Sequence, residues 1–166
     1  MDELVILSAE EADVEKLGVI IEAAFAPSAR PDVPVSGAED LKKAWTAEHT
    51  CIDKIVLNGA LVGGAVLKFE ENGHNRLELY FIAPEAEGRG LGLRAWRLIE
   101  ARYPDTKVWE TETPYFERKN IHFYVNKCGF RIVEYFNEWH PDRRNIYEHP
   151  PQEGGGLFHF EKIMDQ

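Results

Sequence analysis

Three glycines at alternating positions, Gly88, Gly90 and Gly92, are the residues whose type and spacing point most directly to chemistry. Glycine adopts backbone conformations closed to other residues, so such a run can aim several successive backbone N–H groups at one concavity. A helical pattern follows, and the first N–H groups of a helix have no partner within the helix and lie at its positive end. This segment, the glycine turn (residues 87–92), therefore predicts a cradle for a phosphate or pyrophosphate group.

Two familiar phosphate-binding spacings are excluded. The dinucleotide fingerprint needs glycines at its first, third and sixth positions, but the sixth position counted from Gly88 is Leu93. A P-loop needs a first glycine, four intervening residues and then Gly-Lys followed by Ser or Thr, and nothing here matches this spacing. A tight strand-to-helix connection without a ligand is the structural alternative.

Capping sequences and hairpin signals predict the elements that must position this turn. Ser8 with Glu11, and Ser36 with Glu39, are capping boxes that open two helices, and Pro27 ends the first. Two Asn-Gly pairs, at 58–59 and 72–73, separate three consecutive antiparallel strands. The predicted strands are 3–7, 51–57, 60–69, 76–82, 107–111, 130–138 and 157–164, and the later predicted helices are 88–103 and 116–128.

The order of these elements is β-α-α-β-β-β-α-β-α-β-β. It predicts an α/β (α+β) fold with a central mixed, mostly antiparallel sheet flanked by helices, and the strands on either side of helix 88–103 can pair in parallel. The apolar side of that helix is expected to carry Leu91, Ala95, Trp96, Leu98 and Ile99. A long loop, 140–156, rich in Pro, Gly and charge, separates the last two strands.

Composition narrows the class of protein. With 166 residues, 44% hydrophobic and 29% charged, the chain is expected to form one folded domain over residues 1–166. A formal net charge of -10 excludes the broad positive field that attracts nucleic acid or anionic membranes. The sequence shows no export signal and no apolar run long enough to span a bilayer, so we expect a cytoplasmic protein.

Metal and thiol chemistry find little support in the sequence. There is no CxxC pair, and the six histidines have no repeated ligand spacing, so no metal site is expected. A Cys-His nucleophile pair could be built from Cys128 and His122. Cys128 lies within an apolar stretch, however, and is interpreted as a core residue.

Two segments resemble the GNAT superfamily of acyl-CoA-dependent N-acyltransferases. Glu87-Gly88-Arg89-Gly90-Leu91-Gly92, which follows a strand and a turn containing Pro84, is similar to the family's Gln/Arg-x-x-Gly-x-Gly/Ala motif. A helical segment from Asn120 that ends in Gly129-Phe130 is similar to its second conserved region. In element order the resemblance covers nearly the whole chain. It implies a GNAT-type fold, acetyl-CoA as cosubstrate and transfer of an acetyl or another short acyl group to a primary amine. Because the family often forms dimers, it also implies a homodimer.

The resemblance also implies roles for individual residues. The acyl-CoA pyrophosphate would bind at Glu87, Gly88, Arg89, Gly90, Leu91 and Gly92. Backbone groups of Phe81 and Ile82, at a bulge in the preceding strand, would contact the thioester and the pantetheine arm. Tyr124 would protonate the leaving thiolate. Asn120, one helical turn earlier, would bind the pantetheine amides.

Two positions depart from the family pattern. Glu87 stands where Gln or Arg is usual, and a carboxylate repels pyrophosphate, so we expect its side chain to turn away and the backbone N–H groups and Arg89 to bind. The family places its tyrosine four residues before the glycine of Gly-Phe, but Tyr124 lies five residues before Gly129. One residue rotates a helix position by about 100°. Either a local bulge restores the register or Tyr124 is not the acid.

Several assignments stay open. Glu78 is the expected general base for the amine, with an ion pair to Arg76 as the alternative, and Glu110 and Glu112, which share one face of a strand, are in reserve. Five residues that could line an acceptor pocket are unassigned: Trp45, Tyr115, Phe116, Trp139 and His140. The alternative functions are a non-catalytic acyl-CoA-binding sensor of the same fold and a structural protein in which the glycines serve only the turn.

Overall fold

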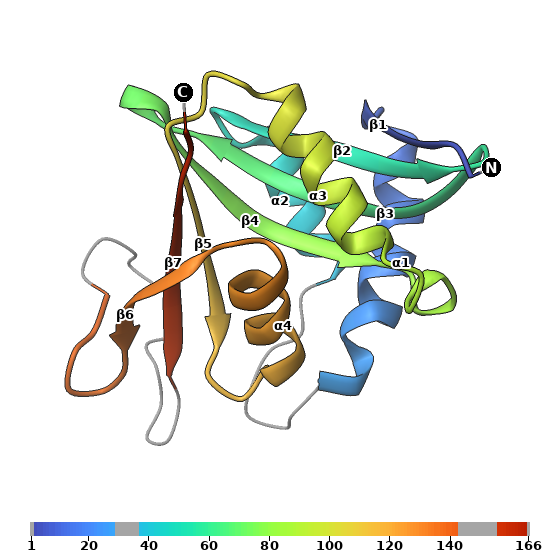
Figure 1. The fold of residues 1–166 in the computed structure, drawn as a ribbon. Helices are drawn as coiled ribbons and strands as arrows, with labels where there is room; N and C mark the ends of the chain where they lie inside the picture. Colours follow the sequence, from blue (N-terminus) through green and yellow to red (C-terminus); the bar gives the residue numbers. More distant parts are fainter. Residues whose placement is uncertain (1, 29–36, 143–155, 166) are drawn as a thin grey trace. The chain divides into compact units, whose positions relative to one another are not determined.

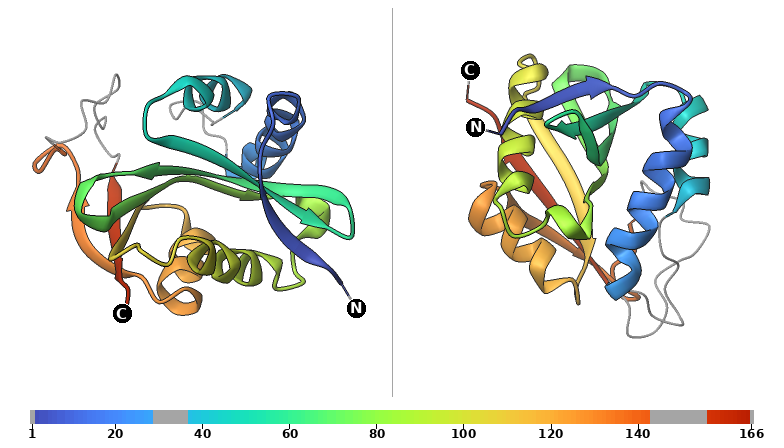
Figure 2. Two further views of the ribbon diagram at one scale, coloured as in Figure 1. Left: turned by 90° about the horizontal axis from the view of Figure 1, so that it is seen from above. Right: turned by 90° about the vertical axis from the view of Figure 1, so that its right-hand side faces the viewer.

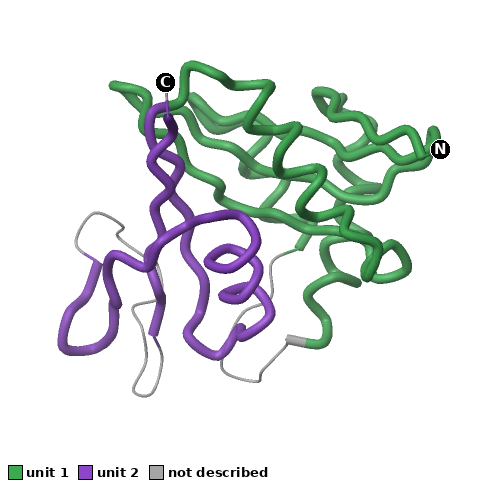
Figure 3. The backbone as a smooth tube through the Cα atoms, viewed as in Figure 1, with its two compact units in different colours: residues 1–106 green, residues 107–166 purple. Residues whose placement is uncertain are grey.

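The computed structural model describes residues 2–28, 37–142 and 156–165 (Figure 1). The chain divides into two compact units, residues 1–106 and 107–166 (Figure 3). A single domain over residues 1–166 therefore stays a prediction. Within the described ranges, no helix is both long and apolar enough to cross a membrane.

The first unit is built on an antiparallel sheet. Its strands β1 (Leu4–Ser8), β2 (Thr50–Leu57), β3 (Ala60–Phe69) and β4 (His74–Ile82) pair in that order. Asn58 and Gly59 both have positive φ angles, 51° and 83°, as the two-residue hairpin between β2 and β3 requires. The prediction of three consecutive antiparallel strands is confirmed.

Helices cover both faces of this sheet. Helices α1 (Asp13–Phe25) and α2 (Ala38–Thr46) lie on one face, and α3 (Leu91–Arg102) lies on the other (Figure 2). The core under α1 and α2 consists of buried apolar side chains from both helices and from β2, β3 and β4: Val14, Leu17, Ile21, Leu41, Ile52, Val66 and Phe81.

The first two helices begin later than predicted. Helix α1 begins at Asp13, not directly after Ser8, because the Asp13 carboxylate accepts the Glu10 N–H at 2.8 Å and so organises the chain before the helix. Helix α2 begins after Gly37, whose N–H donates to Asp40 Oδ2 at 3.2 Å. The predicted cap Ser36 lies outside the described residues.

Helix α3 begins at Leu91, three residues after the predicted start. Leu91, Ala95, Trp96 and Ile99 are buried as predicted, but Leu98 is 39% exposed, so its assignment to the inner side was wrong. The C-terminal end of α3 is fastened to β1, because Arg102 donates to Ile6 O at 3.2 Å and to Ser8 Oγ at 2.8 Å.

The next residue, Tyr103, fastens the same end of α3 to β2. Its hydroxyl donates to the buried Asp53 carboxylate at 2.5 Å.

The described residues of the second unit form three antiparallel strands. Strand β7 (Leu157–Ile163) pairs on one side with β5 (Val108–Pro114) and on the other with β6 (Arg131–Phe136). Helix α4 (Arg118–His122) continues directly into a π-helical turn, Phe123–Lys127. Most of the predicted loop 140–156 lies outside the described residues.

The two units together confirm the predicted fold class, a mixed α/β protein with mostly antiparallel strands and flanking helices. The expected parallel pairing of the strands before and after α3 would join the two units, and it stays a prediction.

Candidate functional site

The glycine turn is anchored at both of its ends. After β4 comes a short 3₁₀ helix, Pro84–Ala86, and then the turn leads into α3. Ala86 and Leu91 are 4% and 2% exposed and belong to an apolar cluster with Leu57 and Ala83. Residues 87–90, between these anchors, are exposed. The cluster therefore holds the base of the turn while its tip stays open to a ligand.

The backbone of the turn explains two of its glycines. Gly88 and Gly90 have φ angles of +83° and +72°, in the left-handed region that favours glycine. A Cβ added at either position would meet nothing within 4 Å, so the backbone conformation, not crowding, requires glycine.

The N-terminus of α3 has backbone N–H groups that could bind an anion. Gly90 is its N-cap and provides no side-chain hydrogen bond, and the first bond of the helix runs from the Arg94 N–H to Gly90 O at 3.2 Å. The N–H groups that precede Arg94 in the first turn have no partner within the helix. Exposed donors at the positive end of a helix are suited to binding a phosphate group.

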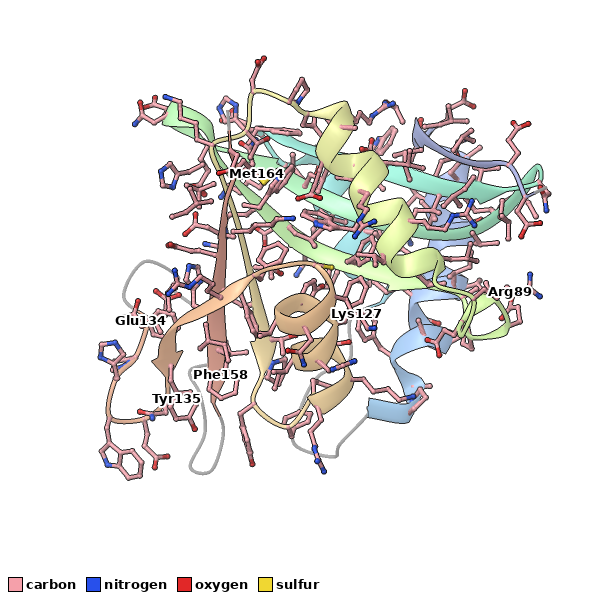
Figure 4. The ribbon with its side chains drawn as sticks, viewed as in Figure 1. Arg89, Lys127, Glu134, Tyr135, Phe158 and Met164 are labelled. Carbon is pink, nitrogen blue, oxygen red and sulfur yellow. The ribbon has the colours of Figure 1, made fainter. Side chains whose placement is uncertain are left out.

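The side chains of the turn fit a backbone-based site. Glu87 is exposed, and its own N–H donates to Pro84 O at 3.2 Å, so that N–H is not one of the free donors. Arg89 projects from the outer tip of the turn (Figure 4). The expectation that Glu87 turns away from the ligand and Arg89 assists binding stays a prediction.

Strand β4, which leads to the turn, carries its bulge at Glu78. Leu77 pairs with Leu67 of β3 and Leu79 pairs with Val66, so Glu78 is an extra residue on β4. From there to Ile82 the pairing with β3 is continuous. The bulge expected at Phe81 and Ile82 is therefore wrong for this pair of strands; a bulge follows the cross-strand register, which a single strand's sequence does not display.

Glu78 itself is 40% exposed and lies 3.7 Å from Arg76 Nε through its Oε1. The ion pair considered as an alternative for Glu78 is thus present. An exposed carboxylate in such a pair stays reachable by a substrate amine, so the role of general base stays a prediction.

Tyr80 on the same strand is a residue that the sequence analysis did not assign. Its hydroxyl donates to the carbonyl oxygen of Gly92 at 2.5 Å. The alternation along β4 places Tyr80 on the face of the sheet opposite to Phe81, but only the structure reveals its contact with Gly92 of α3.

In the second unit, the π turn explains the spacing of Tyr124. The Cys128 N–H donates to Phe123 O at 2.9 Å, five residues back, so this turn contains one more residue than an α-helical turn. The extra residue compensates the five-residue spacing between Tyr124 and Gly129. The structure thus contains a local bulge of the kind that the sequence left open, and the role of Tyr124 as the acid stays a prediction.

Tyr124 is buried among aromatic rings and close to a hydroxyl. Its ring packs on Phe130 and Phe160 with centroid distances of 5.5 and 5.8 Å. Burial raises the pKa of Tyr124 well above its usual range, although a hydrogen bond with Thr111 partly opposes this. Tyr124 is therefore protonated at neutral pH. Asn120 lies one turn earlier and is partly buried.

Glu110 and Glu112 share a face of β5, as predicted, and both contact His159 of β7. Glu110 Oε1 lies 3.0 Å from His159 Nε2, and Glu112 Oε1 lies 3.5 Å from Nδ1. Burial alone would lower the pKa of His159, but the hydrogen bonds with Glu110 and Glu112 outweigh it and raise the pKa to about 9. The two reserve carboxylates are thus engaged with an imidazolium at neutral pH.

Glu161 completes a group that resembles a metal site. Among the described residues, Glu110, His159 and Glu161 place one ligand atom each within 4.8 Å of one another. The ion pairs with His159 account for this arrangement without an ion, so we assign it no metal.

The remaining candidates are distributed over both units. Cys128 is 4% exposed, as expected of a core residue, while His122 is exposed and contacts Asn126. Of the unassigned aromatic residues, Trp45 is 39% exposed and Trp139 is 84% exposed. His140 pairs with Glu134 at 2.6 Å.

Comparison with known proteins identifies a family. The sequence model of the Acetyltransferase (GNAT) family matches residues 20–130. A curated relative, the uncharacterized protein YrkN of Bacillus subtilis, is 40% identical over 168 residues, which cover 94% of this chain and 91% of YrkN.

Solved structures match the fold over nearly the whole chain. The ribosomal-protein-S18-alanine N-acetyltransferase of Escherichia coli superposes with a TM-score of 0.74 at 13% identity, covering 99% of this chain and 96% of that one. A GNAT family acetyltransferase of Elizabethkingia anophelis with acetyl-CoA bound superposes with a TM-score of 0.66 at 14% identity, covering 97% and 98%. At these identities the similarity concerns the fold.

Proposed function

Because the chain belongs to the GNAT family of acetyltransferases, we propose that it transfers an acetyl group from acetyl-CoA to a primary amine by direct attack on the thioester. The family supports acyl-CoA-dependent acetyl transfer in general. The amine acceptor, the direct attack and the residues that carry the chemistry are the parts that we propose here.

The observation that carries the proposal is the open glycine turn. Gly88 and Gly90 bend the backbone into the left-handed region, and the helix that follows has no side-chain cap. A pyrophosphate accepting hydrogen bonds from these N–H groups would also lie at the positive end of α3. Phe81 and Ile82 end β4 just before the turn, so the pantetheine arm of a CoA bound there would extend past their backbone groups.

The reaction requires two proton transfers. The amine nitrogen attacks the thioester carbonyl, the C–N bond forms, and the C–S bond breaks to release the CoA thiolate. We assign the proton lost by the amine to Glu78, which is exposed, whereas Glu110 and Glu112 hold His159. We assign the proton gained by the thiolate to Tyr124, and contacts to the pantetheine amides to Asn120.

The π turn bears on the alternative function. A non-catalytic acyl-CoA sensor was suggested by Glu87 and by the displaced tyrosine. The extra residue in the turn Phe123–Lys127 offers a way to compensate the displacement, which favours the enzyme, whereas Glu87 favours the sensor. The cytoplasmic location, the homodimer and the absence of nucleic-acid and membrane partners remain predictions from the sequence.

Two measurements test the proposal in sequence. Thermal melting with and without acetyl-CoA should show stabilisation, because a ligand that binds only the folded state raises its stability. Release of free CoA thiol is then measured across a panel of amines that includes peptides, lysine, polyamines and amino sugars. Stabilisation together with thiol release supports the enzyme. Stabilisation without release by any amine supports the sensor, and no stabilisation at saturating acetyl-CoA contradicts both.

A further inference from the structure

Tyr80 connects the last part of β4 to the first turn of α3. Its partly buried hydroxyl donates to Gly92 O at 2.5 Å, and its ring meets the Trp96 ring edge-on with a centroid distance of 6.2 Å. Trp96 is fully buried, so it offers a fixed surface against which Tyr80 packs. The pairing of β4 in the sheet and the packing on Trp96 therefore fix the position of the Tyr80 hydroxyl.

The hydrogen bond acts on a particular peptide group. The carbonyl of Gly92 and the N–H of Leu93 belong to one planar trans peptide and point in opposite directions. Gly92 is the second residue of α3, and the Tyr80 hydroxyl adds a side-chain donor at its carbonyl oxygen to the bond that the helix itself provides there. A donor that holds the carbonyl also holds the N–H of Leu93, which lies in the first turn of α3 and has no partner within the helix.

Helix α3 is thus fastened at both ends. Arg102 holds its C-terminal end to β1, and Tyr80 holds its N-terminal end to β4. The glycine turn lies between Tyr80 and this N-terminal end, and two of its residues have a backbone that only glycine favours. Such a segment loses much conformational freedom on binding unless neighbouring contacts restrict it beforehand.

We propose that Tyr80 is a positioning residue for the glycine turn: its hydroxyl orients the Gly92–Leu93 peptide so that the Leu93 N–H is aimed at the pyrophosphate of acyl-CoA before the ligand arrives. This inference rests on the proposed function, because it assigns Tyr80 to the phosphate-binding part of that same site. Tyr80 itself touches no reacting atom.

The test compares two acyl donors in the Tyr80→Phe variant, which keeps the ring and removes only the hydroxyl. Acetyl-CoA carries the pyrophosphate, whereas S-acetylpantetheine has the same thioester and lacks the phosphates. With acetyl-CoA, we expect KM and the Kd of CoA to rise about tenfold and kcat to stay within about twofold. With S-acetylpantetheine, kcat/KM should not change.

The matched control is Tyr135→Phe, which removes a hydroxyl from a 43% exposed tyrosine on β6. This variant should leave kcat/KM for both donors and the Kd of CoA unchanged. An equal loss with both donors would mean that Tyr80 has only a structural role and would overturn the inference. An unchanged Kd for CoA in Tyr80→Phe would also overturn it. If wild-type protein binds CoA but turns over neither donor, the proposed enzyme fails, and the Kd comparison still decides the role of Tyr80.

Discussion

At the scale of single residues, Tyr124 combines burial with a defined hydrogen-bonding partner. Its ring packs on Phe130 and on Phe160, its hydroxyl contacts Thr111, and its pKa is raised by burial. A phenol in this environment keeps its proton throughout the pH range in which enzymes are usually assayed. The protonated form that a general acid needs is therefore present at these pH values.

Replacing Tyr124 with Phe tests this role. We expect kcat to fall about a hundredfold, because a positioned general acid contributes about 10²–10⁴-fold, while KM for acetyl-CoA changes little. Thiol release measured from pH 6 to pH 10 checks both. Since the raised pKa keeps Tyr124 protonated, the wild-type rate should show no decline caused by this group up to pH 10. Equal rates for wild type and variant across the range would remove Tyr124 from the mechanism.

The sequence identified some of the site residues but missed others. The glycines of the turn and Tyr124 belong to local motifs, so their neighbours in sequence are enough to single them out. Tyr80 and His159 owe their contacts to Gly92, Glu110 and Glu112, which are distant in sequence. A strand's own pattern shows which residues share a face, but it does not show which residue of another element lies opposite.

At the scale of elements, the π turn is the feature that reconciles the sequence with the site. The hydrogen bond from the Cys128 N–H to Phe123 O spans five residues instead of the four of an α-helix. The rotation about the helix axis between Tyr124 and Gly129 is therefore smaller than five α-helical residues would give. In the sequence, this turn is visible only as a spacing that is one residue too long. No helix propensity of Phe123–Lys127 distinguishes a π turn from an α-helical turn.

Deleting one residue from this turn should be tolerated. Removal of the exposed Lys127 (Figure 4) leaves Tyr124 four residues before Gly129, the spacing that a regular α-helical turn needs. We expect the deletion variant to keep its kcat within about tenfold, since the extra residue only corrects the register. Insertion of one alanine after Lys127 is the matched opposite change and should lower kcat as much as Tyr124→Phe does. A folded deletion variant as inactive as Tyr124→Phe would contradict this reading.

The helix starts show the same limit of local sequence. Ser8 and Glu11 have the composition of a capping box, but Asp13 organises the start of α1, and Asp40 holds the N-cap residue of α2. Both contacts join residues three positions apart, and the sequence around each start offers more than one polar side chain that could make them. The type and order of the strands and α-helices depend on periodicity over longer segments, and within the described residues they agree with the prediction.

At the scale of the whole molecule, the buried group around His159 links stability to pH. His159 contacts Glu110 and Glu112, with Glu161 Oε1 3.8 Å from Nε2. Its pKa is about 9 in the folded chain and about 6.5 when unperturbed, so the folded state binds the proton more tightly. The resulting stabilisation is fully present below about pH 6.5 and is lost as the pH rises through about 9.

We therefore expect the melting temperature to fall by several degrees between pH 7 and pH 10. His159→Gln should melt lower than wild type at pH 7, because it leaves Glu110 and Glu112 without their cation, and the difference should shrink as the pH rises. Differential scanning fluorimetry of both proteins across this range measures it. A difference in melting temperature that is independent of pH would show that His159 is not charged in the folded protein.

The central claim is that the glycine turn binds acyl-CoA through its backbone, and titration of acetyl-CoA into Gly90→Leu tests it most directly. Gly59→Leu is the matched control, because Gly59 also has an exposed left-handed backbone, with φ of +83° and nothing within 4 Å of an added Cβ, but lies in the β2–β3 hairpin. Both substitutions impose a similar backbone strain of about 1–2 kcal/mol. We predict that Gly59→Leu binds acetyl-CoA as wild type does and that Gly90→Leu, although folded, shows no measurable binding; wild-type affinity in Gly90→Leu would contradict the account.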